Sequence, residues 1–323
     1  MPDNTWYTPY VLPDGDCLSI AASQGVAYRL PNDLVLKMPF QYPIGDIDPT
    51  DLDEAVEQLK SSQSSIDSFE SERAFYRSLS EAGGHVYIVN VDHTTLDHGI
   101  LLEYLQPLED VWSISSTVTR VRWIRQLMRA VARIEELGFT HGDLAIRNMG
   151  VDKNNDLKVF DFGSVHRHSE QGIQMAIERD LSRLGNCLHF LASGKDPLAD
   201  IFELQALRRV ESALKNGTFE IDHLARPLED ILRYCWRQDV GEVGSVNPCK
   251  AFRHLELAVS DALAKATPSL NSEPASSLAI SRGFDESGTR FIFNASEYDL
   301  VPDSRWLAEE QYRDAWKSRG VVL

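Results

Sequence analysis

The sequence predicts an α+β protein with two lobes, and three observations lead to this prediction. Short strand-like segments dominate before residue 106, and helical patterns dominate after residue 110. The pattern changes near Gln106-Pro107, which is the predicted linker. The 323 residues suffice for one large domain or two modest ones. We therefore expect a small strand-rich N-terminal lobe, a larger helical C-terminal lobe and a C-terminal tail.

The first strands are predicted from short apolar segments separated by turn residues. Residues 25–30 and 34–38 flank a turn at Pro31-Asn32-Asp33, which is typical of an antiparallel hairpin. The next segment, residues 42–66, resembles an insertion. It contains a capped helix start near Thr50 and then the serine-rich run SSQSS, which predicts a loop.

Three further elements complete the predicted N-terminal lobe. Apolar residues at helical spacing predict a helix over residues 69–79. Residues 86–91 (VYIVNV) and 99–105 (GILLEYL) are rich in β-branched or apolar side chains. Such segments predict strands, because these side chains pack well on a pleated surface.

The C-terminal lobe is predicted to be helical up to about residue 265. Its clearest helix covers residues 121–138, where one apolar stripe ends at Gly138, a residue suited to a helix C-terminus. Residues 266–289 are rich in Ser and Pro and predict a mobile linker. Residues 303–320 predict a last helix, whose tryptophans favour docking onto the domain.

Composition excludes several classes of function. The net charge of −17 repels phosphate backbones and anionic lipid surfaces, so neither a nucleic acid nor a membrane is an expected partner. The cysteines form no CxxC pair, so neither a zinc site nor a disulfide scaffold is expected. No signal peptide or membrane span is recognisable, which predicts an intracellular protein, cytoplasmic or nuclear. The four cysteines are Cys17, Cys187, Cys235 and Cys249.

The octet HGDLAIRN, residues 141–148, carries the strongest chemical signal. Phosphoryl transfer needs a group that orients the acceptor hydroxyl, ligands for metal ions at the phosphates, and a positioned cation. Asp143 can accept the proton of the hydroxyl, and Asn148 can hold a metal ion. Asp161 stands thirteen positions beyond Asn148, and a hairpin over residues 150–160 would return it beside Asn148.

Together these motifs resemble the protein-kinase superfamily. HGDLAIRN resembles the catalytic loop H-R-D-L-x-x-x-N, and residues 161–163 are the D-F-G motif. The resemblance implies that Asp143 is the catalytic base and that Asn148 and Asp161 hold Mg²⁺. Arg147 would either contact the transferring phosphate or brace the loop.

The resemblance extends into the N-terminal lobe. Residues 34–37 (LVLK) resemble the V-A-I-K strand, which implies that Lys37 binds the α- and β-phosphates of ATP. Its acidic partner is expected to be Glu72, with Glu70 as the second choice. Residues 102–105 (LEYL) resemble the hinge, which implies that ATP lies between the lobes with its adenine against the backbone of Glu103 and Leu105.

The likeness covers residues 14–265, with an N-lobe over 14–105, a C-lobe over 108–265 and a separate tail over 266–323. The run DLSRLG, which begins at Asp180, resembles the start D-x-W-S-x-G of a central helix without its Trp. Asp180 would brace the backbone of the catalytic loop. His141 would be a packed structural residue under Phe162.

The sequence departs from the family pattern in ways that bear on function. The three positions of the Gly-rich loop hold Ile20, Ala22 and Gly25, so only Gly25 is left to let the backbone approach phosphates. Gly142 replaces the Arg that normally receives an activation-loop phosphate. Only sixteen residues separate Gly163 from Asp180, too few for the usual peptide-docking platform. Rio-type kinases have a similarly abbreviated segment. The phosphotransferases that act on aminoglycosides or choline carry a similar H-G-D loop.

The implied function is an ATP- and Mg²⁺-dependent phosphotransferase of the bilobal protein-kinase-like fold. A serine or threonine hydroxyl on a protein is the acceptor that the family favours, and the short activation segment favours a small-molecule hydroxyl instead. The eroded Gly-rich loop favours a pseudokinase that scaffolds a partner, and a self-contained ATPase is a third alternative. The aromatic tail could bind a partner protein.

Overall fold

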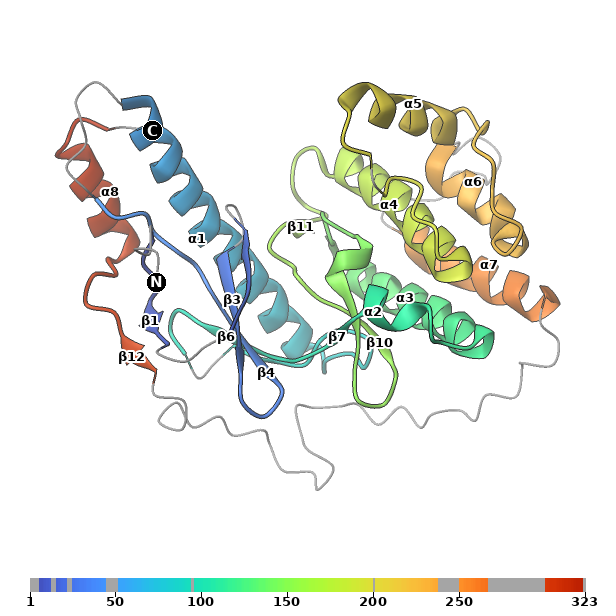
Figure 1. Ribbon diagram of the computed structural model, residues 1–323, viewed down its shortest axis with the longest axis horizontal. Helices are drawn as coiled ribbons and strands as arrows, with labels where there is room; N and C mark the ends of the chain where they lie inside the picture. Colours follow the sequence, from blue (N-terminus) through green and yellow to red (C-terminus); the bar gives the residue numbers. More distant parts are fainter. Residues whose placement is uncertain are drawn as a thin grey trace. The chain divides into compact units, whose positions relative to one another are not determined.

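The computed structural model of the protein describes residues 6–12, 16–21, 25–44, 52–93, 96–199, 201–237, 250–266 and 300–321. The chain folds as two compact units, labelled by their elements in Figure 1. Unit 1 comprises residues 1–80, 90–104 and 282–323, and unit 2 comprises residues 81–89 and 105–281. Unit 1 is rich in strands and unit 2 is larger and mostly helical. This division confirms the predicted fold class.

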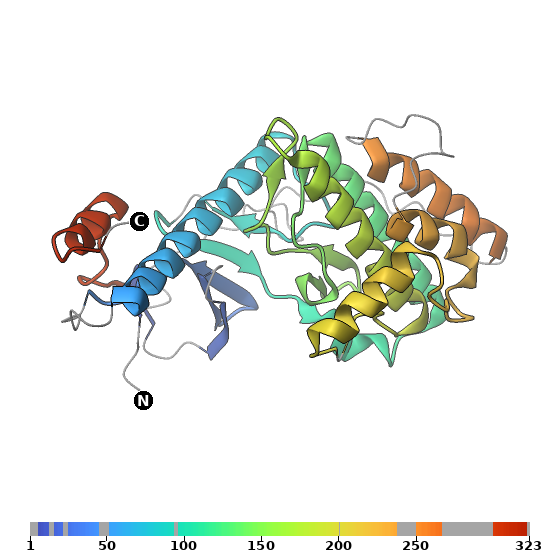
Figure 2. The same cartoon turned by 90° about the horizontal axis from the view of Figure 1, so that it is seen from above.

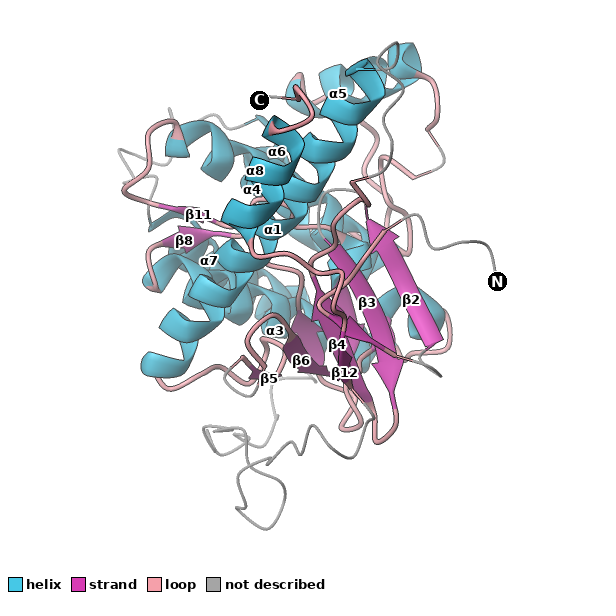
Figure 3. Ribbon diagram, turned by 90° about the vertical axis from the view of Figure 1, so that its left-hand side faces the viewer, coloured by secondary structure: helices cyan, strands magenta, loops and turns pink. Residues whose placement is uncertain are grey.

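A five-stranded antiparallel sheet with the order β2-β3-β4-β6-β5 forms the body of unit 1 (Figure 3). Its strands are β2 (Asp16–Ala21), β3 (Gly25–Leu30), β4 (Leu34–Met38), β5 (Val91–Asp92) and β6 (Ile100–Glu103). The predicted hairpin joins β3 to β4. Asn32 and Asp33 turn the chain at φ 62° and 56°, a conformation that Asn and Asp tolerate better than most residues.

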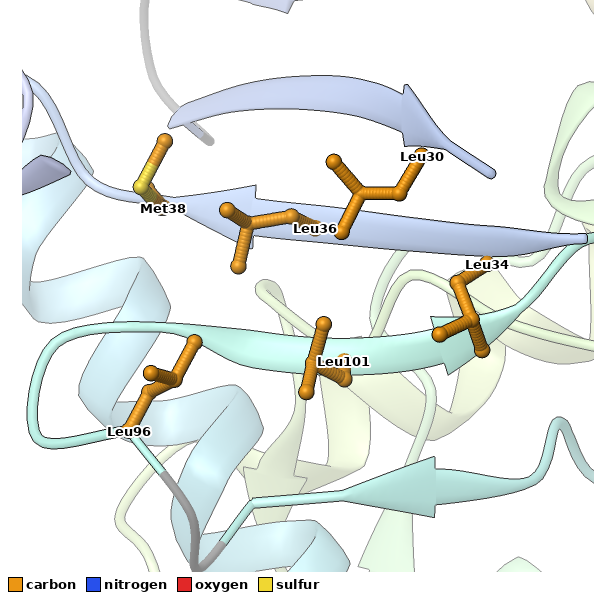
Figure 4. Packing of buried hydrophobic residues seen from close by; sticks show 6 residues of the cluster. All are labelled: Leu30, Leu34, Leu36, Met38, Leu96 and Leu101. Carbon is orange, nitrogen blue, oxygen red and sulfur yellow. The ribbon is translucent and has the colours of Figure 1, made fainter. Parts of the chain in front are cut away.

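The two faces of β4 have different surroundings. Leu34, Leu36 and Met38 alternate along the strand and pack in one apolar cluster with Leu30, Leu96 and Leu101 (Figure 4). Successive side chains of a strand point to opposite faces of a sheet. Lys37 therefore lies on the face opposite this cluster, where it meets a side chain of helix α1.

Helix α1 (Leu52–Glu81) is continuous, so the loop predicted at SSQSS is wrong. The buried hydroxyl of Ser62 accepts a hydrogen bond from the backbone N–H of Tyr42 at 2.9 Å, and that of Ser65 accepts one from Phe40 at 3.1 Å. Serine favours turns because its hydroxyl competes for backbone groups. Here tertiary partners occupy the hydroxyls, so the helix continues through the run.

The C-terminal segment, residues 300–321, belongs to unit 1 and packs on α1 (Figure 1). Strand β12 (Val301–Pro302) pairs with β1 (Tyr10–Val11), and helix α8 (Glu309–Lys317) follows. The predicted helix over 303–320 is therefore shorter than expected. The linker predicted over 266–289 lies outside the described residues. Tyr312, Trp316 and Val321 form a buried cluster with Ala55 and Leu59 of α1.

Unit 2 is built from helices and three short β-pairings. Its helices, coloured from green to orange in Figure 2, include the predicted amphipathic helix as α3, which begins after the N-cap Ser116. The helices are α2 (Leu108–Trp112), α3 (Thr117–Glu136), α4 (Ile173–Ser193), α5 (Leu204–Lys215), α6 (Glu229–Arg237) and α7 (Ala251–Ala266), with 3-10 turns η1 (Ile146–Asn148) and η2 (Arg226–Leu228). Within the described ranges, no helix combines the length and apolar character needed to cross a membrane.

The strands of unit 2 position the loops of interest. β9 (Met149–Val151) pairs with β10 (Leu157–Val159) and with β7 (Gln106–Pro107), and β8 (Phe139–Thr140) pairs with β11 (His166–Arg167). The strand predicted over residues 86–91 is wrong in extent, because β5 covers only residues 91 and 92. Ile88 instead forms an isolated bridge with Val159, and that bridge belongs to unit 2.

Candidate active site

Lys37 and Glu72 form a buried ion pair in unit 1. Nζ of Lys37 lies 2.5 Å from Oε2 of Glu72, and the hydroxyl of Tyr76 donates to Oε1 at 3.1 Å. Lys37 is 9% exposed and Glu72 is 0% exposed. Desolvating two charges costs free energy that their attraction only partly offsets, so such a pair is a candidate functional group rather than a source of stability.

Local structure brings these two residues together. Glu72 lies three residues after Phe69 and four before Tyr76, and all three face the interior of unit 1 from the same stripe of α1. The other predicted acid, Glu70, is exposed and lies 4.0 Å from Arg73. The structure therefore selects Glu72 over Glu70 as the neighbour of Lys37.

The octet of residues 141–148 is anchored in unit 2 by buried side chains. Leu144 and Ile146 are buried apolar residues, and the polar side chains of Asp143 and Asn148 on either side of them are buried too. Gly142 has φ 78°, and the carboxylate of Asp180 on α4 accepts two hydrogen bonds from its N–H, at 3.0 and 3.1 Å. Burial raises the pKa of Asp180, and the hydrogen bond from Gly142 opposes this rise. Asp180 therefore braces the loop backbone as the motif suggests.

Asp143 is held by three side chains. Arg147 donates to Oδ2 at 2.7 Å, and Nδ2 of Asn148 donates to Oδ2 at 3.2 Å and to the backbone carbonyl at 2.8 Å. Nη1 of Arg183 donates to Oδ1 and, at 3.2 Å, to the carbonyl of Gly142. The side chain of Asp143 is 13% exposed, and these contacts hold its carboxylate in one orientation.

Asp161 follows β10, and backbone pairing of the β9–β10 hairpin places it near Asn148. In the β9–β10 hairpin Val159 pairs with Met149, and the N–H of Phe160 donates to the carbonyl of Asn148 at 3.0 Å. Asp161 has φ 67°, an uncommon conformation for a residue with a side chain and one that is often found at functional sites. Phe162 is 0% exposed and its ring centroid lies 4.8 Å from that of His141, so His141 is packed as expected.

The donor set in unit 2 fits a magnesium ion that is shared with phosphate oxygens. Among the described residues, no group of three or more His, Cys, Asp or Glu side chains could hold a metal ion by itself. Asn148 uses its amide nitrogen on Asp143, which leaves its side-chain oxygen for a ligand role. Mg²⁺ commonly takes one or two protein oxygens and completes its shell with water and phosphate. That Asn148 and Asp161 form such a pair remains a prediction from their motifs.

The remaining predicted nucleotide contacts are distributed between the units. Gly25 opens β3 at φ 103°, where an added Cβ would meet the carbonyl oxygen of Met38 at 2.4 Å. Glu103, in unit 1, exchanges backbone and side-chain hydrogen bonds with Asn90, and Leu105 belongs to unit 2. Ala22 and the side chain of Ile20, the other two positions of the Gly-rich loop, lie outside the described residues.

Arg183 is the residue of this site that the sequence reading missed. It stands three positions after Asp180 on α4, so both side chains project from one face of the helix. That spacing was available in the sequence. It carried no chemical meaning there, because only the fold brings that face of α4 against Gly142 and Asp143.

The strand-rich unit with its buried lysine and the helical unit with its Asp–Asn loop define a protein-kinase-like class. Residues 76–182 match the family model described as protein tyrosine and serine/threonine kinase. This match supports membership of the protein-kinase-like superfamily and spans Asp143, Asn148 and Asp161. A comparison with curated proteins found no match.

Proposed function

We propose that this kinase-like protein is an ATP- and Mg²⁺-dependent phosphotransferase that phosphorylates a hydroxyl group. The balanced reaction converts ATP and R–OH to ADP, R–O–PO₃²⁻ and one proton. The observation that carries the proposal is the pairing of Asp143 with Asn148, which leaves the side-chain oxygen of Asn148 for a metal ion. Mg²⁺ when bound to ATP would neutralise the phosphate oxygens during transfer.

The chain's own residues have separate tasks in this proposal. Asp143 orients the acceptor hydroxyl and takes its proton as the oxygen attacks the γ-phosphorus and the bond to ADP breaks. Asn148 and Asp161 bind the metal ion. Lys37 binds the α- and β-phosphates, and Glu72 holds the lysine extended.

The acceptor is proposed to be a hydroxyl on a protein or on a small molecule. A serine or threonine hydroxyl is the acceptor that the kinase family favours. The short segment after Gly163 favours the second choice, because residues 164–172 contain only the two-residue strand β11, and α4 begins at Ile173. Strand β11 is itself paired with β8, so little of this segment remains to dock an extended peptide.

A pseudokinase scaffold is the second candidate, and one observation favours it. Gly25 is needed by the fold itself, since a side chain there would collide with the backbone of β4. The one retained glycine of the loop therefore does not by itself argue for phosphate contact. A scaffold has no need of the hydrogen-bonded pair of Asp143 and Asn148, whereas a phosphotransferase does. We therefore prefer the enzyme hypothesis.

Calorimetry with MgATP tests the nucleotide site first. We expect the wild type to bind MgATP and the Asp161→Ala variant to bind it at least tenfold more weakly. Asp110→Ala, an exposed acid on α2, is the control and should bind like the wild type. A folded wild type that binds no nucleotide at millimolar concentration would contradict the proposal.

Turnover separates the enzyme from the scaffold. ADP formation would be measured with dephosphorylated casein, with a mixture of small-molecule alcohols, and with water alone as acceptors. Asp143→Asn should abolish ADP formation while leaving the thermal midpoint and MgATP affinity nearly unchanged. MgATP binding without turnover on any of these acceptors would favour the scaffold.

A further inference from the structure

Helix α4 contacts the catalytic loop with two side chains on one face. Asp180 accepts from the N–H of Gly142, and Arg183 donates to the carbonyl of the same residue. Both polar groups of the Gly142 backbone are thereby bound by one helix. Side chains carried by a helix hold a geometry more rigidly than side chains carried by a loop.

The hydrogen-bond donors around Asp143 are divided unequally between its two carboxylate oxygens. Each carboxylate oxygen can accept about two hydrogen bonds. Oδ2 receives both Arg147 and Asn148, whereas Oδ1 receives only Arg183 among the contacts within the described part of unit 2. Oδ1 therefore keeps one acceptor direction for an incoming hydroxyl, and Oδ2 does not.

The two arginines differ in how firmly they are placed. The side chain of Arg147 is 65% exposed and that of Arg183 is 34% exposed. Arg147 lies on the same short loop as Asp143, whereas Arg183 projects from a helix of 21 residues. An exposed ion pair is weakened by solvent and by the entropy of a long side chain. Arg183 is thus the better placed of the two to fix the carboxylate.

We infer that Arg183 is a positioning residue for Asp143, and that Oδ1 of Asp143 is the oxygen that receives the acceptor's proton. This inference rests on the proposed phosphotransferase function. Arg183 holds the carboxylate plane through Oδ1 and the Gly142 carbonyl, so that the free direction of Oδ1 points consistently at the acceptor. Neither the resemblance to kinases nor the D-x-W-S-x-G motif assigns this role, because that motif has Ser at the position of Arg183.

Steady-state kinetics on Arg183 variants test the inference. Displacement of a reacting group by about an ångström can cost on the order of 100-fold in rate. We therefore expect Arg183→Ala to lower kcat for ADP formation by about 100-fold, with KM for ATP within about threefold of wild type. Arg183→Lys should recover part of kcat. Arg179→Ala, on an exposed turn of the same helix, should match the wild type.

Chemical rescue separates positioning from folding. Added guanidinium ion at low millimolar concentration should restore part of kcat to Arg183→Ala and have no effect on Arg147→Ala at the same concentration. MgATP binding by calorimetry and the thermal midpoint should stay near the wild-type values in Arg183→Ala. Arg147→Ala should lower kcat less than Arg183→Ala does.

The outcomes distinguish the two proposals. A wild type without turnover contradicts the proposed function. An active wild type with an Arg183→Ala variant that keeps its kcat contradicts the positioning role alone. A lowered kcat that guanidinium does not restore, together with a lowered thermal midpoint in both Arg183→Ala and Arg183→Lys, also contradicts it, because the arginine would then serve the fold.

Discussion

At the scale of single residues, Gly142 shows why residues 141–143 read H-G-D. Its φ of 78° disfavours side chains, and an added Cβ would lie 1.8 Å from the carbonyl oxygen of Ser164. Backbone cannot move aside as a flexible side chain can. The glycine thus follows from the close approach of the Ser164 backbone to the loop, and an arginine could not occupy this position without moving the chain.

Gly142→Ala should therefore be much more destabilising than an ordinary glycine substitution. Gly138→Ala is the matched control, because Gly138 has φ 80° and nothing lies within 4 Å of its added Cβ. The left-handed conformation alone costs roughly 1–2 kcal/mol. We expect the control to lose about that amount in urea unfolding and Gly142→Ala to lose clearly more. Equal losses would show that the loop can relax around the methyl group.

His85 is a second residue whose environment has a measurable consequence. Burial, and then the charges of Arg133 and Arg129, lower its pKa from 6.5 to about 4. Its Nδ1 accepts a hydrogen bond from the N–H of Tyr87 at 3.4 Å, which requires the neutral ring. Between pH 6.5 and about 4 the unfolded chain therefore binds a proton at this site that the folded chain does not.

This difference predicts a loss of stability as the pH falls through that window. The free energy of unfolding should decrease by up to about 1.4 kcal/mol for each pH unit from this site alone. His85→Gln should remove this pH dependence. The free energy of unfolding of the wild type should therefore fall relative to that of the variant as the pH is lowered from 7 to 4. Urea unfolding at half-unit pH steps measures it. Parallel profiles would contradict the assigned cause.

At the scale of elements, the C-terminal segment and helix α1 form one packing unit. The hydroxyl of Tyr312 interacts with Ser62 at 2.9 Å and donates to the carbonyl of Tyr42 at 2.9 Å. The side-chain amide of Gln63 donates to Glu309 at 3.0 Å and accepts from Arg313 at 2.8 Å. The same helix carries Glu72 about three turns further on, so the segment supports the element that presents the partner of Lys37.

Trp316→Ala should destabilise unit 1 and loosen α1. Trp316 is 0% exposed, and truncating a buried Trp or Phe to Ala typically costs about 3–5 kcal/mol. Faster amide exchange is expected over residues 52–66 of α1, measured by hydrogen–deuterium exchange. Lys317→Ala, the exposed neighbour, is the control. Unchanged exchange in α1 would show that the helix does not depend on this packing.

At the scale of the whole molecule, the proposed function joins residues from both units. Lys37 and Glu72 belong to unit 1, whereas Asp143, Asn148 and Asp161 belong to unit 2. A protein with a net charge of −17 also places Arg147 and Arg183 on the carboxylate of Asp143, which concentrates positive charge at this loop. The phosphates of ATP would thus meet the local positive charge of these arginines rather than the negative charge of the whole protein.

Because the proposed function assigns nucleotide contacts to residues of each unit, substitutions in either unit should weaken MgATP binding. We expect Lys37→Met and Asp161→Ala each to lower MgATP affinity by at least about tenfold, equivalent to 1.4 kcal/mol, with one nucleotide bound per chain in the wild type. Lys60→Met, an exposed lysine of α1, is the control for unit 1. Full MgATP affinity in Lys37→Met would contradict the proposed role of Lys37.

The sequence by itself determined the fold class, the hairpin of β3 and β4 that carries Lys37, and the amphipathic α3, because periodicity and turn residues are local signals. The tertiary structure decided what depends on partners far apart in the chain. It made α1 continuous through SSQSS, since residues 40–42 bind its serines. It confined the strand predicted at 86–91 to β5, residues 91 and 92, and brought Arg183 to Asp143. Such contacts depend on which surfaces meet, and no local pattern records that.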